Sequence, residues 1–325
     1  MNTIIQKTLL VTCLSAVAAS QSALAQDTYP QKEIRFITAF SAGSASDIVA
    51  RLLAERLQKN LGQTVIVENK PGASGQIAAD YVKNAKPDGY TIMLATNTTH
   101  SANPYLFKSL RYDPVKDFTP LAQICNFPFV LAVSGTLPVS SIQELIDHKK
   151  NDGAALSYAY GNSTGQISAA AFDKAVGINA TAVPYKSSPQ AMTDIIGGRA
   201  SFMFADLASA GAYIESGKLK ILGVTTKKRS VLAPKLPTIA ETINQPTFDL
   251  AAWVGIFGPA DMPKPIVKRL SDELVKITSS DDMQQRLIKM GAEPTPAPAE
   301  KFGPFVVEQL KVWGEKVKEA GIEPQ

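Results

Sequence analysis

After its N-terminal segment, the chain contains an apolar run, then a stretch of small residues, and then apolar residues at the spacing typical of a helix. Residues 33–40 predict a strand, and from Asp47 onward apolar residues recur every three or four positions, as in an amphipathic helix. Ser46 or Asp47 suits the start of this helix and Gly62 suits its end. The segment Ser41–Asp47 between strand and helix contains only small or polar residues, with no Lys, Arg or His.

The strand–helix alternation continues along the chain and predicts an α/β fold with parallel strands. Expected in the first unit are strands at 64–68 and 91–95 and a helix at 76–84. A second unit follows, with strands at 156–160, 181–184, 202–204 and 218–225 and helices at 138–150, 167–176 and 191–196. Ser140 or Ser141 with Glu144 predicts a capping box on the helix at 138–150.

Two apolar stretches, 121–133 and 250–257, predict crossover strands between the units. After the second crossover we expect helices up to residue 321, interrupted by a Pro-rich loop at 293–300. The pattern therefore predicts two α/β lobes. Lobe 1 is expected to contain residues 26–125 and 250–325, and lobe 2 residues 126–249.

The N-terminus differs from the rest of the chain and predicts a secretory signal peptide at residues 1–25. Lys7 supplies positive charge, residues 8–19 form a short apolar run, and Ala23-Leu24-Ala25 is a typical cleavage site. No later stretch is apolar over the length that a membrane helix needs. We therefore expect an exported, periplasmic protein that is cleaved after Ala25.

Composition and charge narrow the classes of function. The 325 residues carry a net charge of +4 with scattered basic residues, which does not favour a nucleic-acid surface. After removal of the signal peptide Cys125 is the only thiol, so no intrachain disulfide is expected, and its apolar surroundings indicate an inert core residue. One Cys and two His residues cannot supply the usual metal ligands, and no P-loop or dinucleotide fingerprint is present. No metal or cofactor is expected.

The stretch "GNSTG", residues 161–165, matches the nucleophile elbow of α/β-hydrolases and makes Ser163 a candidate nucleophile. The hydrolase triad runs Ser, Asp or Glu, then His along the chain, but His100 and His148 both precede Ser163. A secreted serine hydrolase therefore stays an alternative, and a non-enzymatic role is expected.

The small-residue turns admit a physical interpretation. Each follows a strand and begins a helix, where free backbone N–H groups and the helix dipole attract anions without a cationic side chain. One such turn in each lobe, at Ser41–Asp47 and at Gly161–Thr164, predicts a cleft that holds a carboxylate. Each turn taken singly is equally consistent with a tight loop and a helix cap.

Several longer stretches together resemble a known family. They are "YPQKEIRFITAFSAGSASDIVAR", "LGQTVIVENKPGASGQIAADYVKNAKPDGYTIMLAT", "NPYLFKSLRYDPVKDFTPLAQI", "VPYKSSPQAMTDIIGGRASFMF", "GKLKILGVTTKKRS", "LPTIAE" and "WVGIFGPADMPKPIV". In this order they resemble Bug-type extracytoplasmic solute receptors of tripartite tricarboxylate transporters. The resemblance implies a type II periplasmic binding protein fold, with two α/β lobes, two crossover strands and a central ligand cleft.

The resemblance also implies which residues border the ligand. The candidate ligand-binding residues are Ser41, Ala42, Gly43, Ser44, Ser46, Asp47, Thr98, Gly161, Asn162, Ser163, Thr164, Tyr185, Ser187 and Asp206. The family usually has Pro and Gly where this chain has Ser41 and Ser44. It often has Asp at the position of Ala205, one residue before Asp206.

The expected ligand is a small organic carboxylate, aliphatic or aromatic, most simply a dicarboxylate. Aromatic residues near the crossovers could stack on an aromatic ligand or belong to the core: Phe127, Phe129, Tyr158 and Tyr160. The resemblance implies delivery to the permease subunits of a tripartite tricarboxylate transporter by a monomeric receptor. A ligand-dependent partner of a membrane histidine kinase is the alternative that the sequence leaves open.

Overall fold

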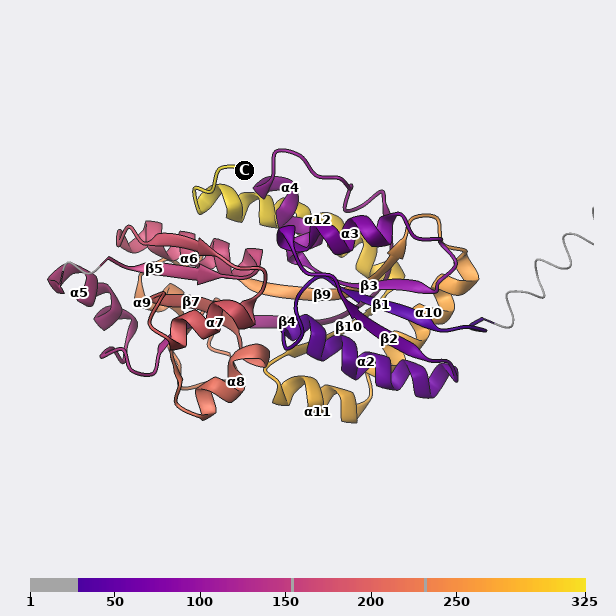
Figure 1. Cartoon of the computed structure of the whole chain (residues 1–325), viewed down its shortest axis with the longest axis horizontal. Coiled ribbons are helices and arrows are strands. Elements are labelled where there is room, and N and C mark those ends of the chain that lie inside the picture. The colour runs from indigo at the N-terminus through magenta and orange to yellow at the C-terminus, as the bar shows by residue number, and fades with distance from the viewer. Residues whose placement is uncertain (1–28, 153–154, 231–232) are drawn as a thin grey trace, which may run out of the picture.

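The computed structural model describes residues 29–152, 155–230 and 233–325. The predicted signal peptide and its cleavage site lie outside these ranges. Two sheets lie end to end, and each is covered by helices (Figure 1). In the part of the chain that the structure describes, no helix has the length and apolar character needed to cross a membrane.

Lobe 1 is built on three parallel strands and the helices between them, as the pattern predicts. Strand β1 pairs in parallel with β2 and with β3. The elements of lobe 1 before the first crossing are β1 (Ile34–Thr38), α2 (Ala45–Leu61), β2 (Val65–Asn69), η1 (Ala73–Gly75), α3 (Gln76–Lys83), β3 (Thr91–Thr96), η2 (Thr98–Ala102) and α4 (Asn103–Leu106).

Lobe 2 repeats the parallel arrangement with β5 between β6 and β7. Its elements are α5 (Ile142–Asp152), β5 (Ser157–Tyr160), α6 (Ser163–Val176), β6 (Thr181–Pro184), α7 (Ser188–Ile196), β7 (Phe202–Asp206), α8 (Leu207–Glu215), β8 (Leu219–Val224) and α9 (Ile239–Thr242). The capping box of α5 is confirmed: the Ser141 hydroxyl accepts from the Glu144 amide, and the Glu144 carboxylate accepts from the Ser140 amide.

One long strand, β4 (Phe118–Ser134), belongs to both sheets. Its first part pairs with β9 (Ala251–Pro259) up to Pro128, and from Phe129 onward it pairs with β7 and β8. The chain returns through Leu250, whose amide donates to the Thr225 carbonyl of lobe 2 just before β9 enters the lobe 1 sheet. The predicted two-lobed fold with two crossovers is confirmed, while the residue boundaries of the lobes stay a prediction.

The C-terminal part returns to lobe 1 and then spans the junction. It contains α10 (Lys264–Thr278), α11 (Asp281–Lys289), β10 (Glu293–Pro298) and α12 (Ala299–Glu319). Helix α12 lies over the junction (Figure 1), and its Glu319 carbonyl accepts from the Lys174 ammonium of α6 at 2.8 Å. The periodicity of α12 predicts a helix but gives no sign of this third link between the lobes.

Two local predictions are wrong. The Pro-rich segment is the strand β10, which pairs with β4 alone. Proline is tolerated there because an edge strand leaves one row of its backbone groups unpaired. The residue that caps α2 is Ser44, with extended backbone and a hydroxyl that accepts from the Asp47 amide, rather than Ser46 or Asp47.

The crossover strands are packed tightly against α12 at one glycine. Gly255 lies in β9 between β3 and β4, and a Cβ there would lie 2.0 Å from the ring of the fully buried Phe302. Phe302 also packs edge-on against Trp253, with ring centroids 5.7 Å apart. The absence of a side chain at residue 255 therefore sets how closely α12 approaches the crossover.

We expect Gly255→Ala to destabilise the protein by about 1–3 kcal/mol, because the added methyl group forces a close-packed ring to move. Urea unfolding measures the change. Gly211→Ala in α8 is the matched control: a Cβ there has open space, so the better helix propensity of Ala should stabilise by about 0.5–1 kcal/mol. Equal effects of the two substitutions would contradict the packing constraint.

Candidate ligand-binding site

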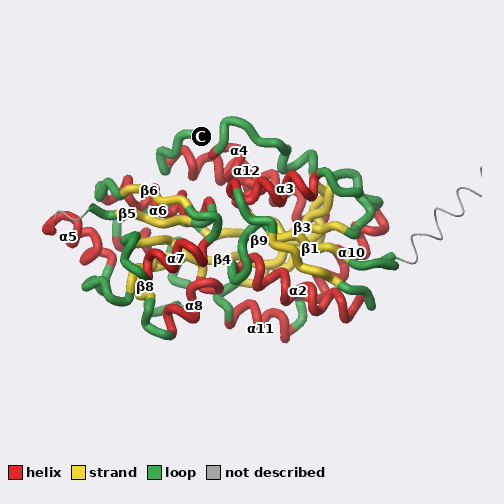
Figure 2. The backbone as a smooth tube through the Cα atoms, in the orientation of Figure 1, coloured by secondary structure: helices red, strands yellow, loops and turns green. Residues whose placement is uncertain are grey.

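A small cavity lies at the junction of the lobes. Loops gather at this junction between the two sets of strands (Figure 2). Its volume is about 30 Å³, which is room for roughly two water molecules. Lobe 1 contributes Phe40, Ser44–Ser46 and Thr96–Thr98; the crossover strands contribute Phe127, Phe129, Ala252 and Val254; lobe 2 contributes Asn162, Thr164, Ser188 and Asp206. The lobes are thus closed on one another around this space.

Among the described residues, four helices begin at this cavity. The residues that precede them are Ser44 for α2, Asn162 for α6, Ser187 for α7 and Asp206 for α8. A helix N-terminus carries partial positive charge and unpaired amide groups. At α2 the amides of Ala45 and Ser46 donate to no described residue. These helix N-termini therefore direct partial positive charge toward the cavity, and its lining, among the described residues, includes no Lys, Arg or His.

Direct hydrogen bonds join the two lobes beside the cavity. The Asn97 side-chain amide donates to the Thr164 hydroxyl at 2.8 Å. The Ser163 backbone amide and hydroxyl both donate to the Thr98 hydroxyl, at 3.2 and 2.9 Å. The structure thus brings together Thr98 of lobe 1 with Ser163 and Thr164 of lobe 2, as the sequence predicts for residues of one site.

Ser163 is not arranged as a hydrolase nucleophile. Its hydroxyl is buried and donates to Thr98, and no described histidine hydrogen-bonds to it. His100 is fully buried, stacks on Phe257 with centroids 4.1 Å apart, and has its Nδ1 2.9 Å from the Thr99 hydroxyl. Burial lowers the pKa of His100 to about 3, so its ring is neutral. His100 is a core residue here.

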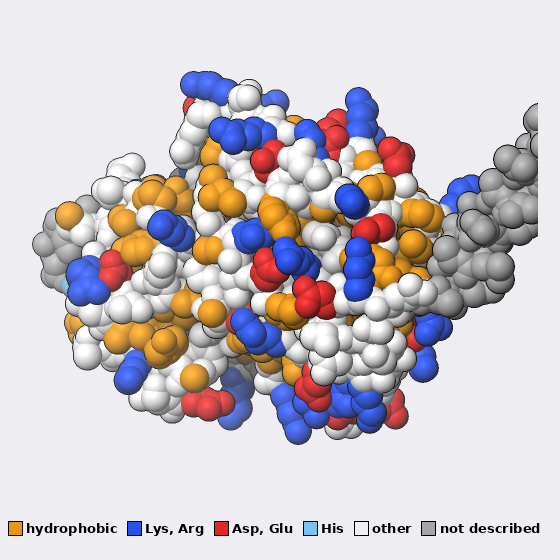
Figure 3. All heavy atoms as spheres, turned by 45° about the vertical axis from the view of Figure 1, so that its right-hand side comes forward, with side chains coloured by type: hydrophobic (Ala, Val, Ile, Leu, Met, Phe, Trp, Pro, Cys, Tyr) orange, Lys and Arg blue, Asp and Glu red, His pale blue; other side chains and the backbone are white. Residues whose placement is uncertain are grey.

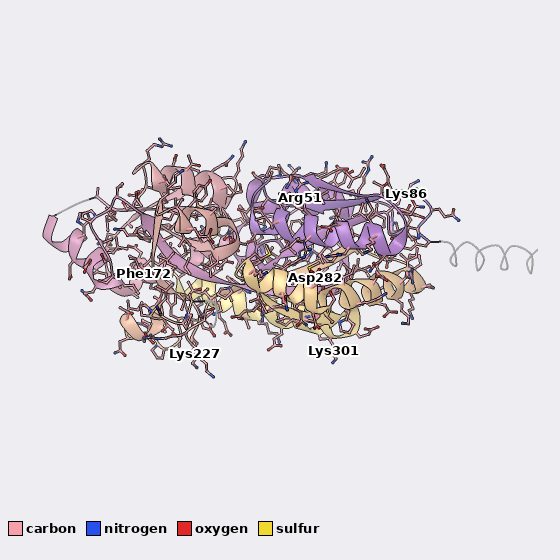
Figure 4. The ribbon with its side chains drawn as sticks, turned by 90° about the horizontal axis from the view of Figure 1, so that it is seen from below. Arg51, Lys86, Phe172, Lys227, Asp282 and Lys301 are labelled. Carbon is pink, nitrogen blue, oxygen red and sulfur yellow. The ribbon has the colours of Figure 1, made fainter. Side chains whose placement is uncertain are left out.

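The buried carboxylate of Asp47 holds the first predicted loop in place through hydrogen bonds. Its carboxylate accepts from the Gly43 amide at 3.0 Å, from the Asn69 side chain at 2.9 Å and from Arg51 at 2.9 Å. Burial alone would raise the pKa of Asp47, but the bonds from Arg51, Asn69 and Gly43 together hold it below its ordinary value. Figure 4 shows Arg51 on α2, close to the junction of the lobes.

The consequence is that only part of the predicted loop lines the cavity. Ser44 and Ser46 line it, whereas Ser41, Ala42 and Gly43 lie outside its lining, with Ala42 and Gly43 exposed. Gly43 adopts a φ of +79°, which favours glycine, and its amide is already donated to Asp47.

The remaining predicted residues lie in lobe 2. Asn162, Thr164 and Asp206 line the cavity. Gly161 and Tyr185 line an adjoining hollow of about 280 Å³, which Asn162 also borders. A Cβ at Gly161 would lie 2.1 Å from the Ser187 carbonyl carbon, so this glycine lets two turns of lobe 2 meet. The roles of all fourteen candidate residues in binding stay predictions.

The sequence interpretation missed some residues that line the cavity. Asn97 is a polar residue directly after the strand β3, the same signal that marked the other turns. Phe40 and Ser188 are adjacent to predicted positions. Phe127 and Phe129 line the cavity, whereas Tyr158 and Tyr160 do not and pack with each other at 6.1 Å.

No group of three or more His, Cys, Asp or Glu side chains among the described residues is placed to hold a metal ion. Cys125 is buried, and burial raises the pKa of its thiol, as expected for an inert core residue. On the face shown in Figure 3, basic and acidic side chains are interspersed rather than gathered by sign.

Comparison with known proteins identifies the family. The family described as "Tripartite tricarboxylate transporter family receptor" matches residues 49–322, most of the chain. The chain belongs to this family. Its members are solute-binding receptors, which agrees with the two-lobed fold around a cavity between the lobes.

Solved structures of similar proteins share the whole fold. The Rhodopseudomonas palustris protein Rpa4515, solved with adipate, is 33% identical, with a TM-score of 0.88 over 91% of this chain and 100% of its own. The periplasmic binding protein BugD is 33% identical, with a TM-score of 0.86 and coverage of 91% and 100%. MatC of R. palustris, solved with malate, is 28% identical, with a TM-score of 0.82 and coverage of 89% and 100%.

We expect Asp47→Asn to destabilise the protein at pH 7 by about 1–3 kcal/mol, because the Gly43 amide and Arg51 lose a charged acceptor. The pKa of Asp47 is lower in the folded state than its ordinary 3.8, so its stabilisation is present above that value and is lost as the pH falls through the folded-state pKa. The difference between variant and wild type in urea unfolding should therefore shrink from pH 7 to pH 3.

Asp282→Asn is the matched control, since this carboxylate is paired with Arg286 but 56% exposed. Its substitution should change the free energy of unfolding much less, because exposed ion pairs contribute little. A variant-to-wild-type difference at residue 47 that stays constant down to pH 3 would contradict the assigned role of its charge.

Proposed function

We propose that this protein is a periplasmic receptor that binds a small organic carboxylate in the cleft between its lobes. The observation that carries the proposal is the convergence of the N-termini of α2, α6, α7 and α8 on one cavity, with no cation among the described residues that line it. Helix N-termini from both lobes favour an anion that contacts both.

The side chains around the cavity supply hydrogen-bond donors that fit a carboxylate. The hydroxyl oxygens of Ser44, Thr98, Thr164 and Ser188 already accept hydrogen bonds, so the proton of each remains available to donate. The Ser46 hydroxyl lines the cavity and has no described partner. A carboxylate offers only acceptors, so the two sets are complementary.

The apolar part of the lining fits the carbon skeleton of such a ligand. Phe40, Phe127 and Phe129 are buried at the cavity wall. The relatives solved with adipate and with malate also support a carboxylate as ligand. Because both lobes supply donors and the walls between them are apolar, a dicarboxylate can place one carboxylate at each lobe.

Binding must be coupled to movement of the lobes. A cavity of about 30 Å³ is smaller than any dicarboxylate, so a ligand enters only when the contacts of Thr98 with Ser163 and of Asn97 with Thr164 open. The ligand then favours a closed form in which it replaces or extends these direct contacts between the lobes. The closed receptor presents one combined surface of both lobes to the permease subunits of a tripartite tricarboxylate transporter.

Ser46→Ala tests the placement of the ligand. The substitution removes a donor to a charged group and breaks no described hydrogen bond, so we expect about ten-fold weaker binding by calorimetry of whichever carboxylate a thermal-shift screen identifies. Ser41→Ala is the matched control, because Ser41 lies in the same loop but outside the cavity lining. Loss of affinity in Ser41→Ala with unchanged affinity in Ser46→Ala would place the ligand elsewhere.

Delivery to a transporter is tested in the cell. Deleting the gene should abolish uptake of the carboxylate that the screen identifies. Normal uptake together with a lost transcriptional response to that carboxylate would instead favour the role as partner of a histidine kinase.

A further inference from the structure

The donor-rich cavity also contains one carboxylate whose second oxygen is not hydrogen-bonded by a neighbouring residue. Asp206 ends β7 and caps α8, and its Oδ1 accepts from both the amide and the hydroxyl of Ser209, at 2.8 and 2.7 Å. No other residue that the structure describes donates a hydrogen bond to its Oδ2. Asp206 is 3% exposed and lines the cavity.

No positive charge compensates this carboxylate within the cavity. The lining residues in the described ranges include no Lys, Arg or His. Burial raises the pKa of Asp206, against the two bonds from Ser209 and the bond from its own backbone amide, which lower it. A buried carboxylate is costly unless it is paired or hydrogen-bonded, and an anionic ligand without a donor adds repulsion to that cost.

A second acceptor in the cavity wall is also unused. Asn97 is fully buried and lines the cavity; its side-chain nitrogen donates to Thr164, but its Oδ1 has no partner among the described residues. Buried polar atoms without partners are uncommon, and in a binding site they are satisfied by the ligand. Asp206 of lobe 2 and Asn97 of lobe 1 thus present unsatisfied oxygens from both sides of the cleft.

We propose that the ligand of this cleft carries a hydrogen-bond donor, an ammonium or a hydroxyl group, on the carbon chain between or beside its carboxylates, and that Asp206 receives it. The inference rests on the proposed function, because the helix N-termini still hold the carboxylate. It adds that the receptor selects amino or hydroxy acids over unsubstituted diacids of the same length.

The physical reason for this selectivity is the cost of an unpaired acceptor. An unsubstituted diacid in the cleft brings no donor to Asp206 Oδ2 and shields it from water, whereas an ammonium or hydroxyl group satisfies it with a charge-assisted hydrogen bond. Sites built to hydrogen-bond a substrate group discriminate strongly against analogues that lack it.

Calorimetry with matched ligands tests the inference on the full mature protein. Succinate, malate and aspartate share a four-carbon skeleton and differ only in the substituent at C2. Glutarate, 2-hydroxyglutarate and glutamate repeat the comparison at five carbons, and adipate with 2-aminoadipate at six. At the length that fits, we expect a substituted acid to bind at least ten-fold more tightly than the plain diacid.

The substitution Asp206→Asn removes the charged acceptor at this position and keeps the side-chain cap of α8. The amide oxygen still accepts from the Ser209 amide, because Asn is a good N-cap, while an NH₂ group replaces the free oxygen. We expect the preference for a substituted acid to fall at least ten-fold and the plain diacid to bind more tightly than to wild type. Asp272→Asn, an exposed carboxylate paired with Lys268 on α10, is the control and should keep the wild-type order of affinities.

Other outcomes overturn the inference in distinguishable ways. Plain diacids that bind as tightly as their substituted analogues would refute it and leave the carboxylate receptor standing. Uptake of one proton on binding of a plain diacid, measured in buffers of different ionisation enthalpy, would show that Asp206 is itself the donor and would also refute it. Failure of all eight acids to bind would remove the proposed function and this inference together. If Asp206→Asn does not fold, the wild-type series alone decides.

Discussion

The direction of the parallel strands decides where this protein can bind a ligand. Within each lobe the strands end at one edge of the sheet, and β4 passes through both sheets so that the two edges face each other. The helices that follow β1, β5 and β7 must therefore begin at the junction, and their N-termini supply partial positive charge there. The small cavity between the lobes is the consequence of this topology.

Much of the fold and part of the site could be predicted from the sequence. The periodicity of apolar residues in strands and helices predicted the two α/β lobes. Small residues after buried strands predicted the turns at Ser44–Ser46 and Asn162–Thr164. Which residues of the first turn line the cavity could not be predicted, because this depends on the hydrogen bond between Asn69, at the end of β2, and Asp47. The hydrogen bond between Lys174 and the end of α12 likewise depends on a contact between distant segments, and so does the burial of Asp206.

The described part of the chain places no cation in the cavity lining, and this affects the release of a ligand as well as its binding. Amides and hydroxyls hold an anion through directed hydrogen bonds, which are lost together when the lobes separate. In the closed form three such hydrogen bonds join the lobes beside the cavity: one from Asn97 to Thr164 and two from Ser163 to Thr98. A ligand that enters must replace or extend these contacts, so its affinity and the closure of the receptor depend on the same few groups.

The most direct measurement is a crystal structure of the protein with its carboxylate bound. We predict that the ligand lies in the cavity between the lobes, with carboxylate oxygens within hydrogen-bond distance of the Ala45 and Ser46 amides and of the Thr164 hydroxyl. A ligand found outside this cavity, or held there by Lys or Arg side chains, would contradict the central role of the helix N-termini.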